Sequence, residues 1–358
     1  MYRNTKNVPY YVFGRGSLAQ LGDLLKPRRE AVDGPVVYFV DHFFRDHELI
    51  GRLPMEKGDQ LHFVDSSSEP EVTRIDAFKE AVSAADSRTP CCVVGIGGGN
   101  ALDTAKAVAN LLTNPGKAED YQGWELVKNP AVYKIGIPTL SGTGSECSRT
   151  CVLTNIPKNL KLGMNSDYTV YDQLLLDPDL LATVPRDQYF YTGIDTFMHC
   201  VESLQGSYRN AIIDAFSIRA VQLCEEIFLS DDMMSEENRE KMMIASYIGG
   251  MAAGNVGVIH PFSAGLGVVL HVAHGLGNCL ALNVLGDIYP KEYKQFRTMI
   301  ERQGVNLPTG ICKDLTEEQY EGLYRGCIVH EKPLTNALGP DFKQILTREN
   351  LIDRKSVV

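Results

Sequence analysis

The first half of the chain alternates between short strand-like segments and helix-like segments, and this alternation limits its fold more than any other feature. Apolar runs rich in β-branched and aromatic residues predict strands at residues 36–40, 61–64, 91–96 and 133–138. Between the second and third strands, residues 72–85 carry apolar side chains on one helical face. Because alternating strands and helices build a parallel sheet with helices on both faces, we predict an α/β fold for this half.

The second half has a different pattern, because strand signals end after Asp177-Pro178 and long helical patterns follow. Pro185 is well placed to start the first of these helices. The 358 residues also exceed the usual size of a single hydrophobic core. We therefore predict an α/β domain over residues 1–183 and an all-α domain over residues 184–358. The expected helices of the second domain are residues 186–204, 211–229, 236–253, 256–270, 293–303 and 317–330.

Composition excludes several classes of partner. The chain carries 35 basic and 45 acidic residues, and the net charge of −10 argues against binding to nucleic acid. No segment approaches the ~20 apolar residues of a membrane span, and the N-terminal stretch MYRNTKNVPYYVFGRGS lacks the apolar core of a signal peptide. The nine cysteines are scattered without a CxxC pair, so we expect reduced, mostly buried thiols. These features predict a cytoplasmic protein without membrane contact.

A glycine triplet follows the third predicted strand and precedes a helix. Gly97, Gly98 and Gly99 let a phosphate group approach the backbone, and the unpaired N–H groups of the following helix attract a pyrophosphate. Asn100 is predicted to be the helix N-cap, with Asp103 completing a capping box. For this motif alone, a purely structural turn is an equal alternative. The pattern also differs from the usual dinucleotide fingerprint, in which the glycines follow the first strand.

Two further features of the first half favour a dinucleotide. Asp41 ends the first predicted strand, where its carboxylate would bind the adenosine ribose hydroxyls and repel the additional phosphate of NADP. An exposed strand-end aspartate without a role is the alternative. The loop PTLSGTGSE, which starts at Pro138, offers hydroxyls and backbone donors after the fourth strand. Two such loops at the carboxyl edge of one sheet predict a bound dinucleotide, with NAD favoured over NADP.

A carboxylate and several histidines gather in the second half. Asp195 and His199 are four residues apart in a helical pattern, so they share one face. His260, His271 and His274 follow within a short apolar, glycine-rich span. For the Asp-x-x-x-His pair alone, a surface or capping pair is the more common explanation. Imidazoles in so apolar a setting need partners, however, and nitrogen and oxygen donors without paired cysteines suit one Zn²⁺ or Fe²⁺ ion.

In these motifs the chain resembles the iron-containing (group III) alcohol dehydrogenases, which share a fold with glycerol dehydrogenase and dehydroquinate synthase. The resemblance covers essentially the whole chain. It rests on the order and spacing of several motifs, which together are far more specific than any one of them. These are GGGN with Asp103 and Lys106, PTLSGTGSE, Lys161, Asp177-Pro178-Asp179-Leu180, Gly193-Ile194-Asp195 with His199, GVIHPFSAGLG and AHGLGN.

The resemblance implies a role for each matching residue. Asp195, His199, His260 and His274 would be the metal ligands. Asp41 would hold the adenosine ribose, and Lys161 would lie near the nicotinamide ribose. The other implied cofactor contacts are Gly97, Gly98, Gly99, Asn100, Asp103, Thr139, Ser141 and Ser145.

The chain departs from the family pattern at Ala264, where most members have a histidine beside the substrate. The usual proton path is therefore in doubt. His271 is the candidate to replace it and, with Lys161, is a candidate catalytic residue; a packing role is the alternative for His271.

Within the family, the sequence looks most similar to enzymes that oxidise the C8 hydroxyl of 3-deoxy-D-manno-octulosonate to an aldehyde. That similarity implies a sugar substrate and a pathway aminotransferase that consumes the aldehyde for lipopolysaccharide synthesis. We also expect a homodimer, which is the default assembly of soluble enzymes. The expected chemistry is hydride transfer to NAD, with a metal lowering the pKa of the hydroxyl. Three alternatives stay open: oxidation of a simple alcohol or polyol, a lyase like dehydroquinate synthase, and direct oxidation by O₂.

Overall fold

The computed structural model describes residues 6–356 and divides into two compact units. The first unit contains the chain up to Leu140, Ser145–Asn155 and Leu162–Thr183. The second contains Ser141–Gly144, Ile156–Lys161 and the chain from Val184. The first unit's last segment ends at Thr183, but two segments within residues 1–183 belong to the second unit, so the predicted division into 1–183 and 184–358 stays a prediction. The first five residues of the N-terminal stretch discussed above lie outside the described residues.

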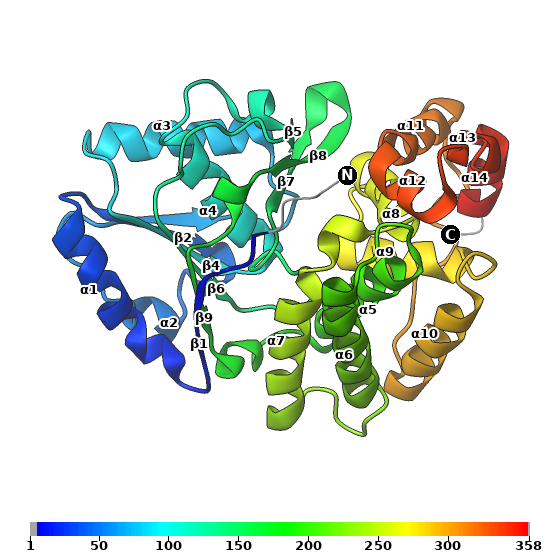
Figure 1. Cartoon of the computed structure of the whole chain (residues 1–358), viewed down its shortest axis with the longest axis horizontal. Coiled ribbons are helices and arrows are strands. Elements are labelled where there is room, and N and C mark those ends of the chain that lie inside the picture. The colour runs from blue at the N-terminus through cyan, green and yellow to red at the C-terminus, as the bar shows by residue number, and fades with distance from the viewer. Residues whose placement is uncertain (1–5, 357–358) are drawn as a thin grey trace. The chain divides into compact units, whose positions relative to one another are not determined.

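A six-stranded sheet, parallel throughout, forms the centre of the first unit (Figure 1). The four predicted strands are present, but β1 and β9 were not predicted. The glycine triplet therefore follows the fourth strand of the chain, not the third. The strands in their order across the sheet are β1 (Tyr10–Phe13), β9 (Gln173–Leu176), β6 (Lys134–Pro138), β4 (Cys92–Gly97), β2 (Val36–Asp41) and β3 (Gln60–Val64).

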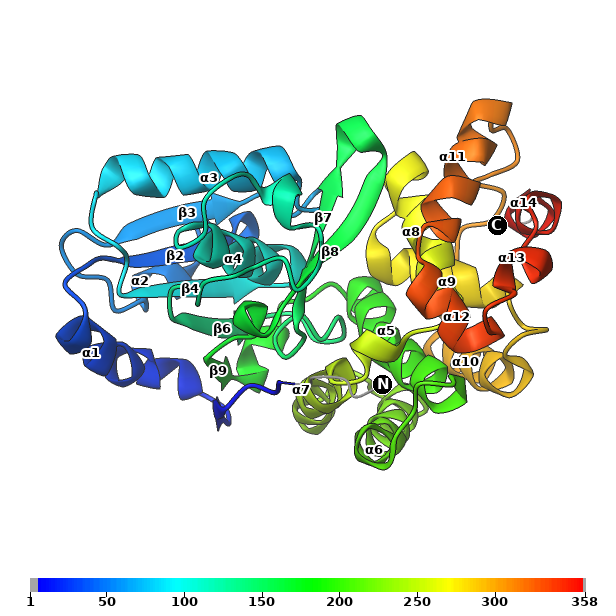
Figure 2. The same ribbon diagram turned by 45° about the horizontal axis from the view of Figure 1, so that its top comes forward.

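Helices cover both faces of this sheet, as predicted (Figure 2). Successive side chains of a strand point to opposite faces. In β2, Val37 and Phe39 accordingly pack with α3 and α4, whereas Tyr38 and Val40 pack with α1 and α2. The two clusters are the hydrophobic core of the first unit. Its helices are α1 (Leu21–Ala31), α2 (Glu48–Gly51), α3 (Val72–Ala85) and α4 (Gly99–Leu111).

A second, smaller sheet of three strands lies within residues 123–165 and was not predicted. Its order is β5 (Gly123–Trp124), β8 (Leu160–Asn165) and β7 (Thr150–Asn155). Alternate residues of β7 are buried, which is typical of a sheet with one covered face.

The second unit is helical, which confirms the predicted fold class. The predicted helix 256–270 begins at Ile259, and the predicted helix 236–253 ends at Gly250. The helices of this unit are α5 (Arg186–Gln205), α6 (Ala211–Phe228), α7 (Glu236–Gly250), α8 (Ile259–Leu270), α9 (His274–Val284), α10 (Pro290–Gln303), α11 (Glu317–Ile328), α12 (Glu331–Leu338), α13 (Phe342–Ile345) and α14 (Arg348–Ser356).

All nine cysteines are buried and free, in agreement with the prediction of reduced thiols. Across residues 6–356, none of the helices combines the length and the apolar character that crossing a bilayer requires.

Candidate metal centre and cofactor loops

One face of α5 carries three acidic or imidazole side chains into the interior of the second unit. Asp195, His199 and Glu202 are spaced by four and three residues, so they lie on adjacent turns of the same face. All three are buried. Buried carboxylates are rare in proteins unless they are paired, so this face must meet positive groups from other helices.

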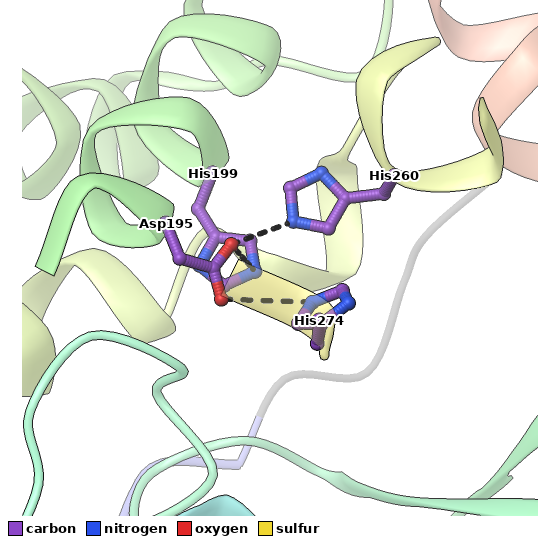
Figure 3. A group of neighbouring side chains, drawn as sticks. All are labelled: Asp195, His199, His260 and His274. Carbon is purple, nitrogen blue, oxygen red and sulfur yellow. Dashed lines mark hydrogen bonds and ion pairs between the residues drawn. The ribbon is translucent and has the colours of Figure 1, made fainter. Parts of the chain in front are cut away.

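The partners of these carboxylates are imidazoles from the starts of α8 and α9. His260 lies in the first turn of α8, and His274 is the first residue of α9. Nε2 of His260 is 3.1 Å from Oδ1 of Asp195, and Nε2 of His199 is 3.6 Å from the same oxygen. Nε2 of His274 is 3.5 Å from Oδ2 of Asp195 (Figure 3). One ligand atom from each of the four residues therefore lies within 4.8 Å of the others.

The position of His274 depends on a close approach between α9 and α5. A Cβ atom on Gly275 would lie 2.7 Å from the carbonyl oxygen of Tyr191 on α5. Real Cβ contacts are never that short, so only glycine lets the first turn of α9 rest on the backbone of α5. The glycine after His274 therefore places this imidazole beside Asp195.

Two residues that the sequence did not single out hold the cluster in place. Oε2 of Glu202 accepts a hydrogen bond from Nδ1 of His260 at 2.5 Å, and Oε1 accepts one from the N–H of Ile259. Nδ2 of Asn278 donates to Oδ1 of Asp195 at 2.7 Å. A carboxylate on the far nitrogen of a ligand imidazole fixes its orientation and tautomer. The signal for Glu202 was its spacing on α5, and for Asn278 its position four residues after His274.

Burial and charge act in opposite directions on the pKa values of the cluster. Burial raises the pKa of Asp195, but the surrounding imidazoles outweigh it and hold that pKa well below its usual range. Burial lowers the pKa of His199 to about 4. Burial also lowers the pKa of His260, yet Glu202 and Asp195 outweigh it and raise the pKa to about 9. The two carboxylates thus attract one positive charge at this point, which a proton or a metal ion can supply.

The donor set fits a divalent metal. Oδ2 of Asp195 is fully buried and accepts no hydrogen bond from the described residues, and an unsatisfied buried carboxylate oxygen is costly. A cation among the four residues would satisfy it. Three imidazole nitrogens and one carboxylate oxygen are donors that both Zn²⁺ and Fe²⁺ accept. The residues therefore fit one such ion.

In the first unit, Asp41 and Gly97 lie side by side at the carboxyl edge of the large sheet. β2 and β4 are neighbours, but the next strands, β3 and β6, lie on opposite sides of this pair. Ligands of open α/β sheets bind at such a switch point. Gly97 has a φ of 150°, and a Cβ atom there would lie 2.9 Å from Cβ of Asp41. Oδ1 of Asp41 accepts hydrogen bonds from the N–H of Phe43 and from Oγ of Ser66.

The predicted capping box at the start of α4 is wrong. α4 begins at Gly99, and the preceding residue, Gly98, is the N-cap because its backbone has an extended conformation. Asn100 therefore lies within the first turn, where its Nδ2 donates to the carbonyl groups of Ser66 and Ser68. Since no side chain caps the helix, its N-terminus keeps the character of an anion site.

Asp103 of α4 anchors the loop that follows β6. Its Oδ1 accepts a hydrogen bond from Oγ of Ser145, and its Oδ2 accepts one from the N–H of Val152 at 2.8 Å. The fully buried Lys106, one turn further on, donates to the carbonyl oxygens of Ser145 and Thr150. The side chains of Asp103 and Ser145 are thus hydrogen-bonded to each other. Their predicted contacts with a cofactor stay predictions.

The other predicted site residues have different surroundings. The N–H of Thr139 donates to the carbonyl of Gly97 at 3.0 Å. Ser141 belongs to the second unit, and its buried hydroxyl has no hydrogen-bond partner among residues 6–356. Lys161 is mostly buried.

His271 is exposed and ends α8 with a φ of 55°. Within the described chain, no hydrogen bond or ion pair joins it to the four clustered residues.

Comparison with known families decides what kind of protein carries this site. The sequence model of the iron-containing alcohol dehydrogenases matches residues 9–178, and that of their C-terminal domain matches residues 189–322. The chain belongs to the iron-containing alcohol dehydrogenase family. This confirms the resemblance found in the motifs.

Two relatives in the iron-containing alcohol dehydrogenase family illustrate the sequence identity and the coverage of the match. The sulfoacetaldehyde reductase of Bilophila wadsworthia is 34% identical over 220 residues, which are 60% of this chain and 56% of that protein. The NAD-dependent methanol dehydrogenase of Bacillus methanolicus is 30% identical over 278 residues, 75% of this chain and 71% of that protein. The match thus spans little more than half the length of the first relative. The predicted class, an oxidoreductase acting on CH–OH groups, is the class of these relatives.

Solved structures share the fold over nearly the whole chain. An alcohol dehydrogenase from Oenococcus oeni has a TM-score of 0.83 at 22% identity and covers 99% of both chains. A sulfoacetaldehyde reductase from Bifidobacterium kashiwanohense, solved in complex with NAD⁺, has a TM-score of 0.79 at 24% identity and covers 99% of this chain and 97% of its own. These likenesses confirm the predicted fold.

Proposed function

We propose that this family member oxidises a hydroxyl group of a small polar molecule to a carbonyl, with NAD as hydride acceptor and one Fe²⁺ or Zn²⁺ ion as cofactor. The observation that carries the proposal is the convergence of three Nε2 atoms on the buried carboxylate of Asp195. Family membership supports the proposal, because the names of the two relatives given above describe enzymes that interconvert alcohols and carbonyl compounds.

Each group of residues has a separate task in this proposal. Asp195, His199, His260 and His274 hold the metal, which supplies the Lewis acidity that lowers the pKa of a hydroxyl group. Glu202 and Asn278 fix the orientation of two of these side chains. The glycines after β4 and the uncapped start of α4 receive the pyrophosphate of NAD. The nicotinamide supplies the redox chemistry, so the protein's contribution is binding and orientation.

The experiment is a substrate panel with protein of measured metal content. NAD⁺ is added with methanol, propane-1,3-diol, 2-hydroxyethanesulfonate or 3-deoxy-D-manno-octulosonate, and NADH absorbance is recorded together with dissolved oxygen. The proposal expects NADH in proportion to the carbonyl product with at least one of these alcohols. Oxygen consumption without NADH would contradict it, and so would conversion of a substrate without net NADH, the behaviour of a lyase.

The substrate that we propose first is 3-deoxy-D-manno-octulosonate, oxidised at C8. This narrower choice rests on the overall resemblance of the sequence to enzymes that act on this sugar, and on Ala264. An aldehyde at C8 would then serve an aminotransferase, which would supply an 8-amino sugar for lipopolysaccharide, in the cytoplasm. NADH formed only with the octulosonate in the panel supports this choice, whereas NADH formed only with the other alcohols discards it.

Asp41 is predicted to set the preference for NAD. In the Asp41→Asn variant an amide oxygen can still accept the hydrogen bonds from Phe43 and Ser66, but the negative charge is gone. Since that charge would repel the additional phosphate of NADP, the ratio of kcat/KM for NADP⁺ to that for NAD⁺ should rise by about tenfold or more. Asp46→Asn, at a nearby exposed aspartate, serves as the control. An unchanged ratio would remove Asp41 from the ribose site.

We also propose a homodimer formed through the exposed edge of the large sheet. β1 is an edge strand, and Tyr10, Tyr11 and Phe13 expose 66%, 58% and 40% of their surfaces. Monomeric proteins protect such edges with charges or prolines. Light scattering should give about twice the chain mass of 39.6 kDa, and Tyr10→Lys should shift the protein toward the monomer. A wild-type monomer at micromolar concentration would exclude this assembly.

A further inference from the structure

His330, between α11 and α12, has a buried nitrogen for which the fold supplies no partner. Its Nε2 is closed to solvent and has no hydrogen bond within residues 6–356. An unsatisfied polar atom in the interior costs free energy, so such an atom in a native protein calls for an explanation. The surroundings of this imidazole provide one.

The packing of α11 on α8 directs the chain that follows α11 toward the start of α8. A Cβ atom on Gly322 would lie 3.1 Å from Cγ2 of Val269, and one on Gly326 would lie 3.0 Å from Cα of Gly265. The two helices are therefore antiparallel, since four residues forward on α11 correspond to four residues backward on α8. α11 runs toward the start of α8, where His260 lies, and it ends at Ile328, two residues before His330.

The electrostatic surroundings agree with this placement. Burial lowers the pKa of His330 to about 4, and the positive charges of Lys161 and His260 lower it in the same direction. His330 is therefore a neutral imidazole at neutral pH, able to donate or accept one hydrogen bond. Lys161, in the same unit, lies near α8 as well, because its Nζ is 3.8 Å from the position of a Cβ atom on Gly267.

We propose that His330 belongs to the substrate site, where its Nε2 hydrogen-bonds a second polar group of a substrate whose reacting hydroxyl lies at the metal ligands. The inference rests on the proposed function and narrows it. Ala264 on the same helix as His260 offers no polar atom, so His330 would provide polar recognition that α8 does not. It predicts a preference for diols, hydroxy acids or hydroxysulfonates over alcohols without a second polar group.

The test compares His330→Ala and His330→Gln with the wild-type holoenzyme. Gln is chosen because its side-chain amide can occupy a position close to that of Nε2. Kinetics are measured with NAD⁺ and methanol, propane-1,3-diol, 2-hydroxyethanesulfonate and 3-deoxy-D-manno-octulosonate. Calorimetry without NAD⁺ measures the dissociation constants of the last three compounds, and metal content and thermal unfolding are recorded for every variant. Val329→Ala, at an exposed neighbouring position, is the matched control.

The proposal expects His330→Ala to weaken binding and to lower kcat/KM by about tenfold or more for the compounds with a second polar group that the wild type oxidises. Metal content should stay at the wild-type level, and His330→Gln should recover part of the loss. Any turnover of methanol should change by less than about twofold, since methanol has no second group to lose the hydrogen bond.

Two different failures can be told apart. If the wild type oxidises a panel compound with NAD⁺ but His330→Ala binds and oxidises it equally well, the role of His330 is wrong and the proposed function stands. A loss of thermal stability alone in both variants would likewise overturn the role of His330, because it would mean that the side chain only packs. If the metal-loaded wild type reduces NAD⁺ with none of the compounds, the proposed function fails and the role of His330 fails with it.

Discussion

Replacing His274 by alanine is expected to abolish metal binding and NAD⁺ reduction together. The side chain of His274 is 29% exposed, and His274 is the first residue of α9 and is not one of its buried residues. The fold should therefore survive the loss of this side chain. The loss leaves two imidazoles and one carboxylate, and Oδ2 of Asp195 then has no neighbouring imidazole from α9. Metal content after dialysis should fall from about one ion per chain to nearly none, and turnover should fall by at least about 10³-fold.

The two readouts of this variant are linked. Unchanged far-UV circular dichroism will show that the helices are intact, so that loss of metal is not loss of fold. Full metal content with full turnover in His274→Ala would remove this residue from the site. Loss of turnover with the metal still bound would instead assign His274 a role other than that of a ligand.

Replacing Glu202 by glutamine should weaken metal binding by about 10–100-fold, although Glu202 does not contact the metal in the proposed site. The carboxylate accepts a hydrogen bond from Nδ1 of His260 and one from the N–H of Ile259. An amide of the same shape can accept only one of these, because its nitrogen is a donor. The imidazole of His260 would lose both its fixed tautomer and part of its basicity.

Metal affinity, measured by competition with a chelator, tests this role separately from activity. Glu237→Gln provides the control, since Glu237 is 76% exposed and lies on α7, away from the cluster on α5. If saturating metal restores the turnover of Glu202→Gln, Glu202 positions a ligand. Wild-type affinity in this variant would contradict the role, and so would a loss of turnover that excess metal does not repair.

The central strands could be predicted from the sequence, whereas the edge of the sheet could not. β2 and β4 are buried on both faces, so their sequences are continuous apolar runs. β1 has the sequence YYVF, with exposed aromatic side chains, and it pairs with Gln173–Leu176 far along the chain. Nothing local distinguishes such a segment from a loop, because its strand structure is determined by a distant partner.

The same distinction applies to the site. The spacing of Asp195 and His199 predicted a shared helix face, and the motifs supplied His260 and His274 as candidates. The contact between Glu202 and His260 joins residues that are 58 positions apart and lie on two helices. The spacing of residues within one helix therefore cannot predict it. The N-cap of α4 was misplaced because Gly98 can adopt the extended conformation itself, so the helix did not need the side chain of Asn100.

In the proposed function, a metal held by Asp195 and three histidines is required for hydride transfer to NAD⁺. The most direct measurement is a titration of metal-stripped protein with Fe²⁺ or Zn²⁺ under anaerobic conditions, in which the rate of NADH formation is recorded with the best compound of the panel. We predict no NADH without metal and a rate that rises to a plateau at one ion per chain. A full rate of NADH formation in the stripped protein would contradict the claim.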